Sequence, residues 1–253
     1  MHAFDVGTSL LSSSLRGWRG TGAFAPAQRQ PERLLELYEF EACPYCRRVR
    51  EALTALDLDA LIYPCPAGGQ RFRPHVVELG GKSQFPLLLD PNTDTRLYES
   101  GDIIDYLARR YDGHAPRLPA PLVGITQLSG GLATIARGLR GAGARPSRAP
   151  AQPLELYGFE SSPYTRLVRE VLCELELPYI SRSAGKASWR DIGPPGLRRR
   201  LFPNAPVRGR NRRRLLAATG RVQLPYLVDP NRDMRLFESA AIIGYLQREY
   251  AAG

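Results

Sequence analysis

Apolar and polar positions along the chain follow a pattern that predicts short strands and amphipathic helices in a fixed order. Residues 34–38 form a short apolar run that predicts a buried strand. After them, Val49, Leu53 and Leu56 recur at helical spacing, which places one apolar stripe on a helix beginning at Pro44. The further expected elements are a strand at 61–63, a helix at 72–79, strands at 86–89 and 96–98, and a helix at 100–111 capped by Ser100. The order is βαβαββα.

The same pattern occurs twice, because the chain contains an internal repeat. Residues 35–58 and 154–177 are identical at 15 of 24 positions, and residues 84–107 and 223–246 are identical at 15 of 24. The offset is 119 residues in the first block and 139 in the second, so the second copy carries 20 extra residues between its blocks. The strands of the second copy are expected near 153–158, 179–182, 225–228 and 235–237.

A shorter repeat precedes each copy. Residues 16–22 (RGWRGTG) resemble residues 137–143 (RGLRGAG), and a mildly amphipathic apolar stretch lies before each. We expect these lead-in segments to pack against the two copies or against each other, with contact to a membrane surface as the alternative. Residues 1–30 are rich in Ser and Arg, which also suits a transit peptide, but the internal copy favours a structural role.

The repeats together predict a division of the whole chain. The expected parts are a lead-in segment at 1–32, a first domain at 33–113, a linker with the second lead-in segment at 114–151, and a second domain at 152–253 that contains an Arg-rich insertion at 193–218.

Composition excludes several classes of protein. With 253 residues, 43% hydrophobic and 24% charged, the chain has an ordinary globular balance and is not expected to be disordered throughout. Four cysteines do not make a disulfide scaffold, and no apolar run approaches the roughly 20 residues that span a bilayer. The first 14 residues lack the basic flank and long apolar stretch of a secretory signal.

The positive charge is concentrated in one place. The net charge is +10, and residues 192–228 hold nine arginines and no acid, so the rest of the chain carries +1 (10 − 9). Eight of these arginines lie within Arg198–Arg214, where they favour an acidic protein or a membrane surface as partner. A solvated loop is the plain alternative. Nucleic acid is the least favoured partner, since Phe202 and Trp189 are the only nearby stacking residues and no nucleic-acid motif is present.

The motif C-P-Y-C lies between the first strand and the first helix. Cys43 would stand at the helix N-terminus, where free N–H groups favour a thiolate, so we expect it to have a lowered pKa and to be the nucleophile, with Arg47 and Arg48 adding positive charge. Cys46 is the candidate resolving thiol. A zinc half-site and inert thiols are the alternatives. Zinc needs four ligands, and the sequence has no second CxxC or paired His, so no metal is expected.

These residues carry a resemblance to known families. The C-P-Y-C motif resembles the dithiol motif of glutaredoxins, and Q-F-P at 84–86, Y-E-S at 98–100 and I-I-x-Y-L at 103–107 resemble the N-terminal domain of glutathione transferases. The chain is similar, over residues 33–111 and 152–250, to a group of proteins with two such domains in tandem. The resemblance implies an α/β fold of two tandem thioredoxin-like domains, each preceded by a helical lead-in segment.

The same resemblance implies a glutathione-binding site in the first copy. Pro86 would follow a cis peptide bond and would let the backbone of Phe85 pair with glutathione, whereas a plain strand start is the alternative. Ser100 and its helix N-terminus would bind the γ-glutamyl carboxylate, and Glu99 the ammonium group. Ordinary helix capping is the alternative for these two residues. Tyr45, within the C-P-Y-C motif, completes the expected site.

The second copy differs at the cysteines. Ser162 stands in place of Cys43 and Thr165 in place of Cys46, so dithiol chemistry is excluded there. The expected second site, if it binds glutathione, consists of Ser162, Leu224, Pro225, Glu238 and Ser239. We expect this copy to be a degenerate scaffold that packs on the first, with a Ser-type transferase or glutathione-binding site as the alternative.

Two further cysteines lie outside any motif. Cys173 falls on the first helix of the second copy and is expected in the core. Cys65 follows a strand and is expected to be exposed, as a bystander or alternatively as an extra resolving thiol.

Together these features predict a glutathione-linked thiol–disulfide oxidoreductase of glutaredoxin type. Its substrate would be a disulfide-bearing protein or small molecule, with glutathione as co-substrate. The alternatives are a glutathione transferase or isomerase working at Cys43 or Ser162, and a non-catalytic adaptor that docks an acidic partner through the Arg-rich insertion. A reducing cytoplasm suits a dithiol of this kind, and a plastid stroma is the alternative if the N-terminus is an address.

Overall fold

The computed structural model describes residues 3–112, 129–193, 200–202 and 205–252. Part of the predicted linker, and Arg198 and Arg199 of the Arg-rich insertion, lie outside the described residues.

The first copy has the predicted order of elements. These are β1 (Leu35–Glu39), α2 (Pro44–Ala55), β2 (Ala60–Pro64), α3 (Arg73–Gly80), β3 (Leu87–Asp90), β4 (Thr95–Leu97) and α4 (Ser100–Leu107). The last helix is shorter than predicted, because a π-helical turn, η1 (Ala108–Asp112), replaces its end.

The second copy repeats this order with one addition. Its elements are β5 (Leu154–Gly158), α6 (Pro163–Glu174), β6 (Tyr179–Ser183), a 3₁₀ turn η2 (Trp189–Asp191), α8 (Arg210–Thr219), β7 (Tyr226–Asp229), β8 (Met234–Phe237) and α9 (Ser239–Tyr250). α8 lies between β6 and β7, where the repeated order predicts a helix equivalent to α3, and all but its last residue belong to the Arg-rich insertion. Both lead-in segments are helical, as α1 (Ala3–Leu15) and as residues 129–135.

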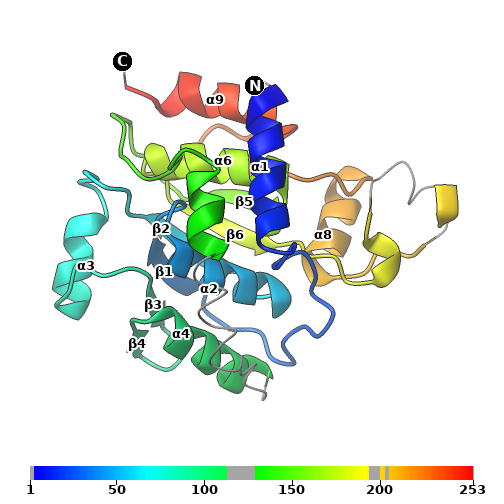
Figure 1. Cartoon of the computed structure of the whole chain (residues 1–253), viewed down its shortest axis with the longest axis horizontal. Helices are drawn as coiled ribbons and strands as arrows, with labels where there is room; N and C mark the ends of the chain where they lie inside the picture. Colours follow the sequence, from blue (N-terminus) through cyan, green and yellow to red (C-terminus); the bar gives the residue numbers. More distant parts are fainter. Residues whose placement is uncertain (1–2, 113–128, 194–199, 203–204, 253) are drawn as a thin grey trace.

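The two copies share one eight-stranded sheet, in the order β4-β3-β1-β2-β6-β5-β7-β8 (Figure 1). The α/β class and the thioredoxin-like order are therefore as predicted. β2 and β6 pair antiparallel at the centre, with Leu61 opposite Ile180. These residues occupy equivalent positions (180 − 61 = 119), so an approximate twofold axis passes between them. The pairing gives each copy a partner for an otherwise exposed strand edge. The division into separate domains stays a prediction.

The strands have different cores on their two faces, because successive side chains point to opposite sides. On one face, a single apolar cluster runs through both copies and includes Leu37, Leu53, Leu156 and Leu172 from β1, α2, β5 and α6. The opposite face has two separate small clusters. One lies under α3 and contains Tyr38, Cys65, Val76 and Leu87, and the other lies under α8 and contains Tyr157, Leu215 and Tyr226.

A group of buried charges joins the two copies, and we call it the seam cluster: Glu39, Glu41, Arg47, Arg50, Glu160, Arg166 and Arg169. Its central ion pairs cross between the copies in both directions. Arg50 Nε lies 2.9 Å from Glu160 Oε2, and Arg169 Nε lies 2.9 Å from Glu41 Oε2. Arg169 and Glu160 are the repeat equivalents of Arg50 and Glu41. Each copy therefore pairs its arginine with the equivalent glutamate of the other copy.

Each lead-in helix makes contacts with the other copy, although α1 also accepts a hydrogen bond at Ser12 from Arg47 of its own copy. In α1, the hydroxyls of Ser9 and Ser13 donate to the carbonyls of Pro163 and Ser161 at 2.8 and 2.7 Å. The helix at 129–135 contacts the first copy. None of the described helices combines the length and apolar character that crossing a bilayer requires.

Candidate functional site

Cys43 is the N-cap residue of α2. Its backbone is extended (φ −73°, ψ 121°), Pro44 follows at the first helical position, and its sulfur accepts a hydrogen bond from the Cys46 N–H at 3.3 Å. The N–H groups of a first helical turn have no partner within the helix, and here they point toward the sulfur.

These contacts separate the acidities of the two thiols. The pKa of Cys43 is lowered because the Cys46 thiol and the backbone N–H groups of Cys46 and Tyr45 donate to it, although burial acts in the opposite sense. Burial, and its hydrogen bond to Cys43, raise the pKa of Cys46 well above the ordinary thiol value. Cys43 is therefore the thiol that ionises first.

Access to Cys43 is narrow, since 4% of its surface is exposed and Cys46 is fully buried. The helix at 129–135 lies over the loop that carries it. The Thr134 hydroxyl donates to the Ala42 carbonyl at 3.0 Å, and a Cβ added to Gly130 would stand 3.1 Å from the Pro44 ring. Tyr45, by contrast, is exposed.

Phe85 lies against the loop that leads to Cys43, and the bond between Phe85 and Pro86 is cis, as the resemblance implies. The Phe85 ring contacts Phe40 edge-on, with the ring centres 5.9 Å apart. The Phe40 carbonyl in turn accepts the Cys43 N–H at 3.1 Å. Arg73 places its guanidinium 4.8 Å from the centre of the Phe85 ring.

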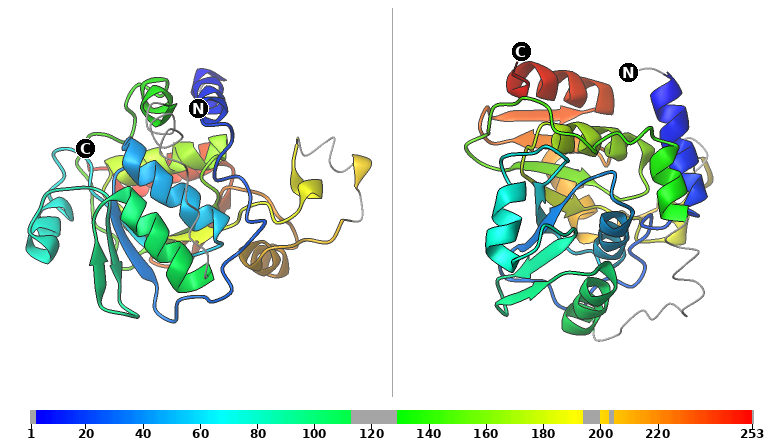
Figure 2. Two further views of the ribbon diagram at one scale, coloured as in Figure 1. Left: turned by 60° about the horizontal axis from the view of Figure 1, so that its bottom comes forward. Right: turned by 60° about the vertical axis from the view of Figure 1, so that its left-hand side comes forward.

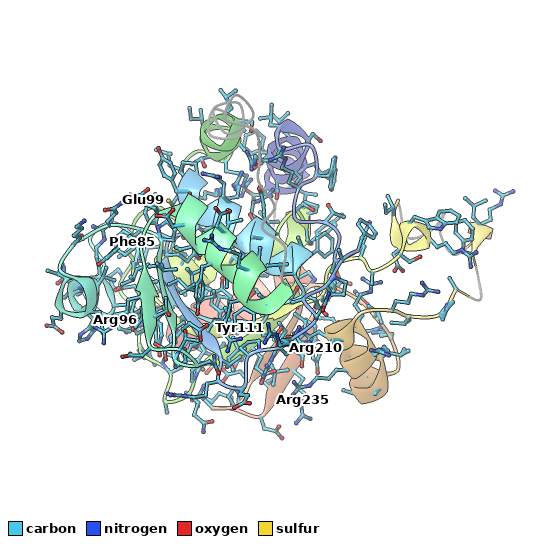
Figure 3. All side chains as sticks on the ribbon, turned by 90° about the horizontal axis from the view of Figure 1, so that it is seen from below. Phe85, Arg96, Glu99, Tyr111, Arg210 and Arg235 are labelled. Atoms are coloured by element: carbon cyan, nitrogen blue, oxygen red, sulfur yellow. The ribbon has the colours of Figure 1, made fainter. Side chains whose placement is uncertain are left out.

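The N-terminus of α4 lies on the same side of the molecule as Phe85 (Figure 3). Glu99, not Ser100, is its N-cap residue; it has a positive φ of 62°, and its carboxylate accepts a hydrogen bond from Gln84. Ser100 is the first residue of the helix, where its hydroxyl accepts a hydrogen bond from Arg48 at 3.0 Å. The guanidinium and the positive end of the helix together form a setting that suits a carboxylate.

The arginines near the motif differ from expectation. Arg48 contacts Ser100, and Arg47 is turned into the seam cluster, 3.6 Å from Glu160. Sequence reasoning also missed Arg73, because its place at the start of α3 belongs to no motif. The helical spacing of Arg47 and Arg48 indicates that they point to different sides, but not which neighbour each one meets.

The second copy reproduces the backbone of this site. Ser162 is the N-cap of α6 and accepts hydrogen bonds from the N–H and hydroxyl of Thr165 at 3.2 and 2.9 Å. The bond between Leu224 and Pro225 is cis, and Glu238 caps α9 with a φ of 68°. Ser239 follows at the first helical position. Leu167 stands in place of Arg48, so the second copy lacks that guanidinium at the equivalent position.

The two remaining cysteines are both buried. The prediction that Cys65 is exposed is wrong, because it lies in the small core under α3, and burial raises its pKa. Cys173 is in the core of α6 as expected and donates to the Gly141 carbonyl at 3.2 Å. Within the described part of the chain, no group of three or more His, Cys, Asp or Glu side chains is placed to hold a metal ion.

The Arg-rich insertion is partly structural and is not a solvated loop throughout, because α8 forms part of it, whereas the predicted partner of its arginines stays a prediction. Arg210 binds both oxygens of Asp59 at 2.9 and 3.0 Å, and the buried Arg212 lies 3.5 Å from Asp191. Arg213 and Arg214 are exposed on α8.

Comparison with known proteins shows which family the chain resembles. The family model described as glutathione S-transferase, N-terminal domain, matches residues 37–115 and 156–252. The glutathione S-transferase-like protein tpcF of Aspergillus fumigatus is 36% identical over 74 residues, or 29% of this chain. The match spans about a third (32%) of the length of that relative. A solved structure, Bombyx mori glutathione transferase BmGSTD1, is similar at 24% identity over 36% of this chain and 42% of that one, with a TM-score of 0.32. Because the family model covers more than half of the sequence, the chain belongs to the glutathione S-transferase N-terminal domain family.

Proposed function

We propose that the first copy is a glutathione-linked thiol–disulfide oxidoreductase of glutaredoxin type. The observation that carries the proposal is the Cys43 sulfur at the N-terminus of α2, where hydrogen bonds from Cys46 lower its pKa. Membership of a glutathione transferase family supports a role for glutathione. A reducing cytoplasm is the compartment that we propose, because the dithiol must be reduced to turn over.

In the proposed reaction, the Cys43 thiolate attacks the glutathione sulfur of a mixed disulfide. A bond forms between Cys43 and glutathione, and the other thiol leaves as a thiolate that takes a proton from solvent. Cys46 then gives up its proton and attacks Cys43, a Cys43–Cys46 disulfide forms, and glutathione leaves. Two further glutathione molecules reduce this disulfide and are released as oxidised glutathione. Because the pKa of Cys46 is high, direct attack by a second glutathione competes with Cys46.

The neighbouring residues have proposed roles in holding glutathione. Ser100, with Arg48 beside it, would bind the γ-glutamyl carboxylate at the N-terminus of α4. Glu99 would bind the ammonium group, and the backbone of Phe85 would pair with the extended tripeptide. The positive φ of Glu99 supports this assignment, since strained backbone is enriched at ligand sites.

The narrow access to Cys43 favours a small or extended substrate. With 4% of Cys43 exposed and residues 130–134 over its loop, a folded protein surface has little room to approach. We therefore propose glutathione mixed disulfides of small molecules, or of flexible peptide segments, as substrates.

The test is an intact-mass measurement after equilibration with oxidised glutathione. Wild type should lose two hydrogens as Cys43 and Cys46 join, whereas Cys46→Ser should gain one glutathione on Cys43. The matched variant Cys43→Ser should gain none, because Cys46 is buried with a raised pKa. If neither wild type nor Cys46→Ser is modified under conditions in which a free thiol reacts, the proposal is ruled out.

A transferase is the second candidate, and the geometry of Ser162 supports it. Its hydroxyl occupies the same capping position as Cys43, and the second copy also keeps the cis bond before Pro225. Conjugation of glutathione to an electrophile should then survive the double change Cys43→Ser and Cys46→Ser and be lost in Ser162→Ala. If instead conjugation is lost in the double variant and survives in Ser162→Ala, the activity belongs to the first copy.

A further inference from the structure

The helix α1 is amphipathic, but its polar side is buried and its apolar side faces solvent, an arrangement that we call inverted. Its buried side carries hydroxyls: Ser9, Ser12 and Ser13 are fully buried. Its solvent side carries large apolar residues, with Phe4 76% and Leu11 51% exposed. A surface helix of a soluble protein ordinarily places these faces the other way round.

The helix at 129–135 is inverted in the same way. Thr134 is buried, and so is Arg137 just beyond the helix. Ile135 and Leu139 are 68% and 58% exposed, and Leu132 is exposed one turn earlier. Leu132 and Ile135 are three residues apart on the helix, so they lie on the same side of it, and Leu139 is exposed in the turn that follows.

The two inverted segments lie side by side in both views of Figure 2. They run antiparallel, because Arg16 near the end of one donates to Ser129 at the start of the other at 2.7 Å, while Arg137 donates to the Asp5 carbonyl at 2.9 Å. The same two arginines form ion pairs of 2.6 Å with Glu51 and Glu170 beneath. Ion pairs and hydroxyls therefore fix the inner sides of the pair.

The outer sides together form one surface, which we call the outer face. It consists of Phe4, Leu11, Leu15, Trp18, Leu132, Ile135 and Leu139. Large exposed apolar patches of this kind mark sites of interaction with a protein or a membrane.

The charge around the outer face indicates what covers it. Residues 4–23 and 129–144 contain four arginines, of which Arg16 and Arg137 are buried in ion pairs with carboxylates beneath the helices. The one carboxylate in these residues, Asp5, is buried and lies 3.0 Å from Arg140, whose side chain stays half exposed. Arg19 and Arg140 are exposed next to Trp18 and Leu139. Apolar residues with Trp and a cationic rim are typical of helices that lie in a lipid interface. A second copy of this chain would bring the same positive rim and be repelled.

We propose that the outer face binds the surface of an anionic lipid bilayer. The apolar side chains of both segments enter the boundary between headgroups and acyl chains, and Arg19 and Arg140 meet lipid phosphates. The proposal goes beyond the redox function and does not depend on it.

The test uses the full chain with vesicles of phosphatidylcholine, with or without phosphatidylglycerol. The chain has two tryptophans, so Trp189→Phe leaves Trp18 as the single fluorescent reporter in the outer face. We expect the protein to sediment with the anionic vesicles. The emission of Trp18 should shift to the blue, and its fluorescence should be protected from quenching by acrylamide. All three should weaken in high salt and with pure phosphatidylcholine.

A matched pair of triple variants locates the contact. Both triple variants are made in the Trp189→Phe protein. Vesicle partitioning should fall by more than roughly tenfold in the outer-face triple, which combines Leu132→Gln, Ile135→Gln and Leu139→Gln. The control triple Val77→Gln, Leu216→Gln and Met234→Gln changes exposed apolar residues on α3, α8 and β8 and should leave partitioning unchanged. Arg213→Gln with Arg214→Gln should cause a smaller loss than the outer-face triple. Unchanged urea unfolding shows that each variant is folded.

Several results would overturn the proposal. These are absence of binding to anionic vesicles, full binding by the outer-face triple, and unchanged Trp18 emission on protein that sediments with vesicles. Self-association that disappears in the outer-face triple, without vesicle binding, would instead assign the face to a second copy.

Discussion

At the scale of single residues, Cys43 and Cys46 show how position within one helical turn decides acidity. The sulfur of Cys43 lies just before α2 and accepts hydrogen bonds, whereas the sulfur of Cys46 is enclosed in the first turn. Burial penalises a charged thiolate and donors stabilise it, so the two pKa values move in opposite directions.

Removing the thiol donor should raise the pKa of Cys43. A hydrogen bond to a charged group contributes about 1.5–3 kcal/mol, so Cys46→Ala should raise that pKa by roughly one to two units. Cys46→Ser keeps a donor and is the matched control, with a smaller rise. The measurement is the pH dependence of iodoacetamide alkylation of Cys43, read by mass. A midpoint in Cys46→Ala equal to that of wild type would show that the thiol donor is unimportant.

At the scale of elements, the N-termini of α2 and α6 have the same geometry with different chemistry. Cys43 and Ser162 both have an extended backbone and both accept a hydrogen bond from the N–H three residues on. The neighbouring strands differ: Gly158 replaces Glu39, and a Cβ at Gly158 would collide with the Thr165 side chain. In the second copy, the glycine in the strand leaves room for the Thr165 side chain, and the capping hydrogen bond at Ser162 is kept.

This likeness predicts that dithiol chemistry can be restored in the second copy. The double variant Ser162→Cys with Thr165→Cys should lose two more hydrogens than wild type on oxidation, because the backbone already holds the two positions at capping distance. Intact mass after oxidation measures this. The single variant Ser162→Cys is the control and should not form the extra disulfide. Failure of a well-folded double variant to close it would mean that the caps are not equivalent.

At the scale of the whole molecule, the seam cluster holds the two halves of the sheet together. Burial opposes the charge of Glu160, but the guanidinium groups of Arg169, Arg50 and Arg47 outweigh it and lower its pKa to about 2. Glu39 behaves differently, since burial outweighs Arg50 and raises its pKa to about 7. Glu160 is therefore charged at neutral pH, and together with Glu41, whose pKa is also lowered by Arg169 and Arg50, it links the copies.

Removing that charge should destabilise the protein in a pH-dependent way. Loss of one partner from a buried ion pair costs about 3–5 kcal/mol, so Glu160→Gln should lower the free energy of unfolding by about that amount at pH 7. The lowered pKa of Glu160 means that its contribution is complete above about pH 4.5 and is lost as the pH falls toward 2. Urea unfolding of both proteins across this range measures the difference.

The control is an ion pair at the surface. Glu249 lies 3.8 Å from the exposed Arg232, so Glu249→Gln should change stability by less than about 1 kcal/mol at any pH. A constant gap between wild type and Glu160→Gln from pH 7 to pH 2 would contradict the assignment of the charge to Glu160.

The sequence predicts the elements of each copy well, because their signals are local. Helical spacing after Pro44 and the D-P-N turn after β3 act over a few residues, and the repeat confirms each signal by a second occurrence. The sequence predicts the contacts of single side chains much less well. Arg47, Arg48 and Arg73 look alike in the sequence, yet they meet Glu160, Ser100 and Phe85.

By itself the sequence determined the repeated βαβαββα unit, its α/β class, the C-P-Y-C motif in one copy and its loss in the other. These follow from spacing and residue type within short segments. The tertiary structure alone decided that β2 meets β6 in one sheet, that Glu160 pairs with arginines of both copies, that Cys65 is buried, and that the lead-in segments turn their apolar sides outward. The burial of Cys65 depends on Tyr38, Val76 and Leu87 from other elements of its own copy, and the remaining features depend on pairs about 100 or more positions apart. No local pattern encodes this packing and desolvation.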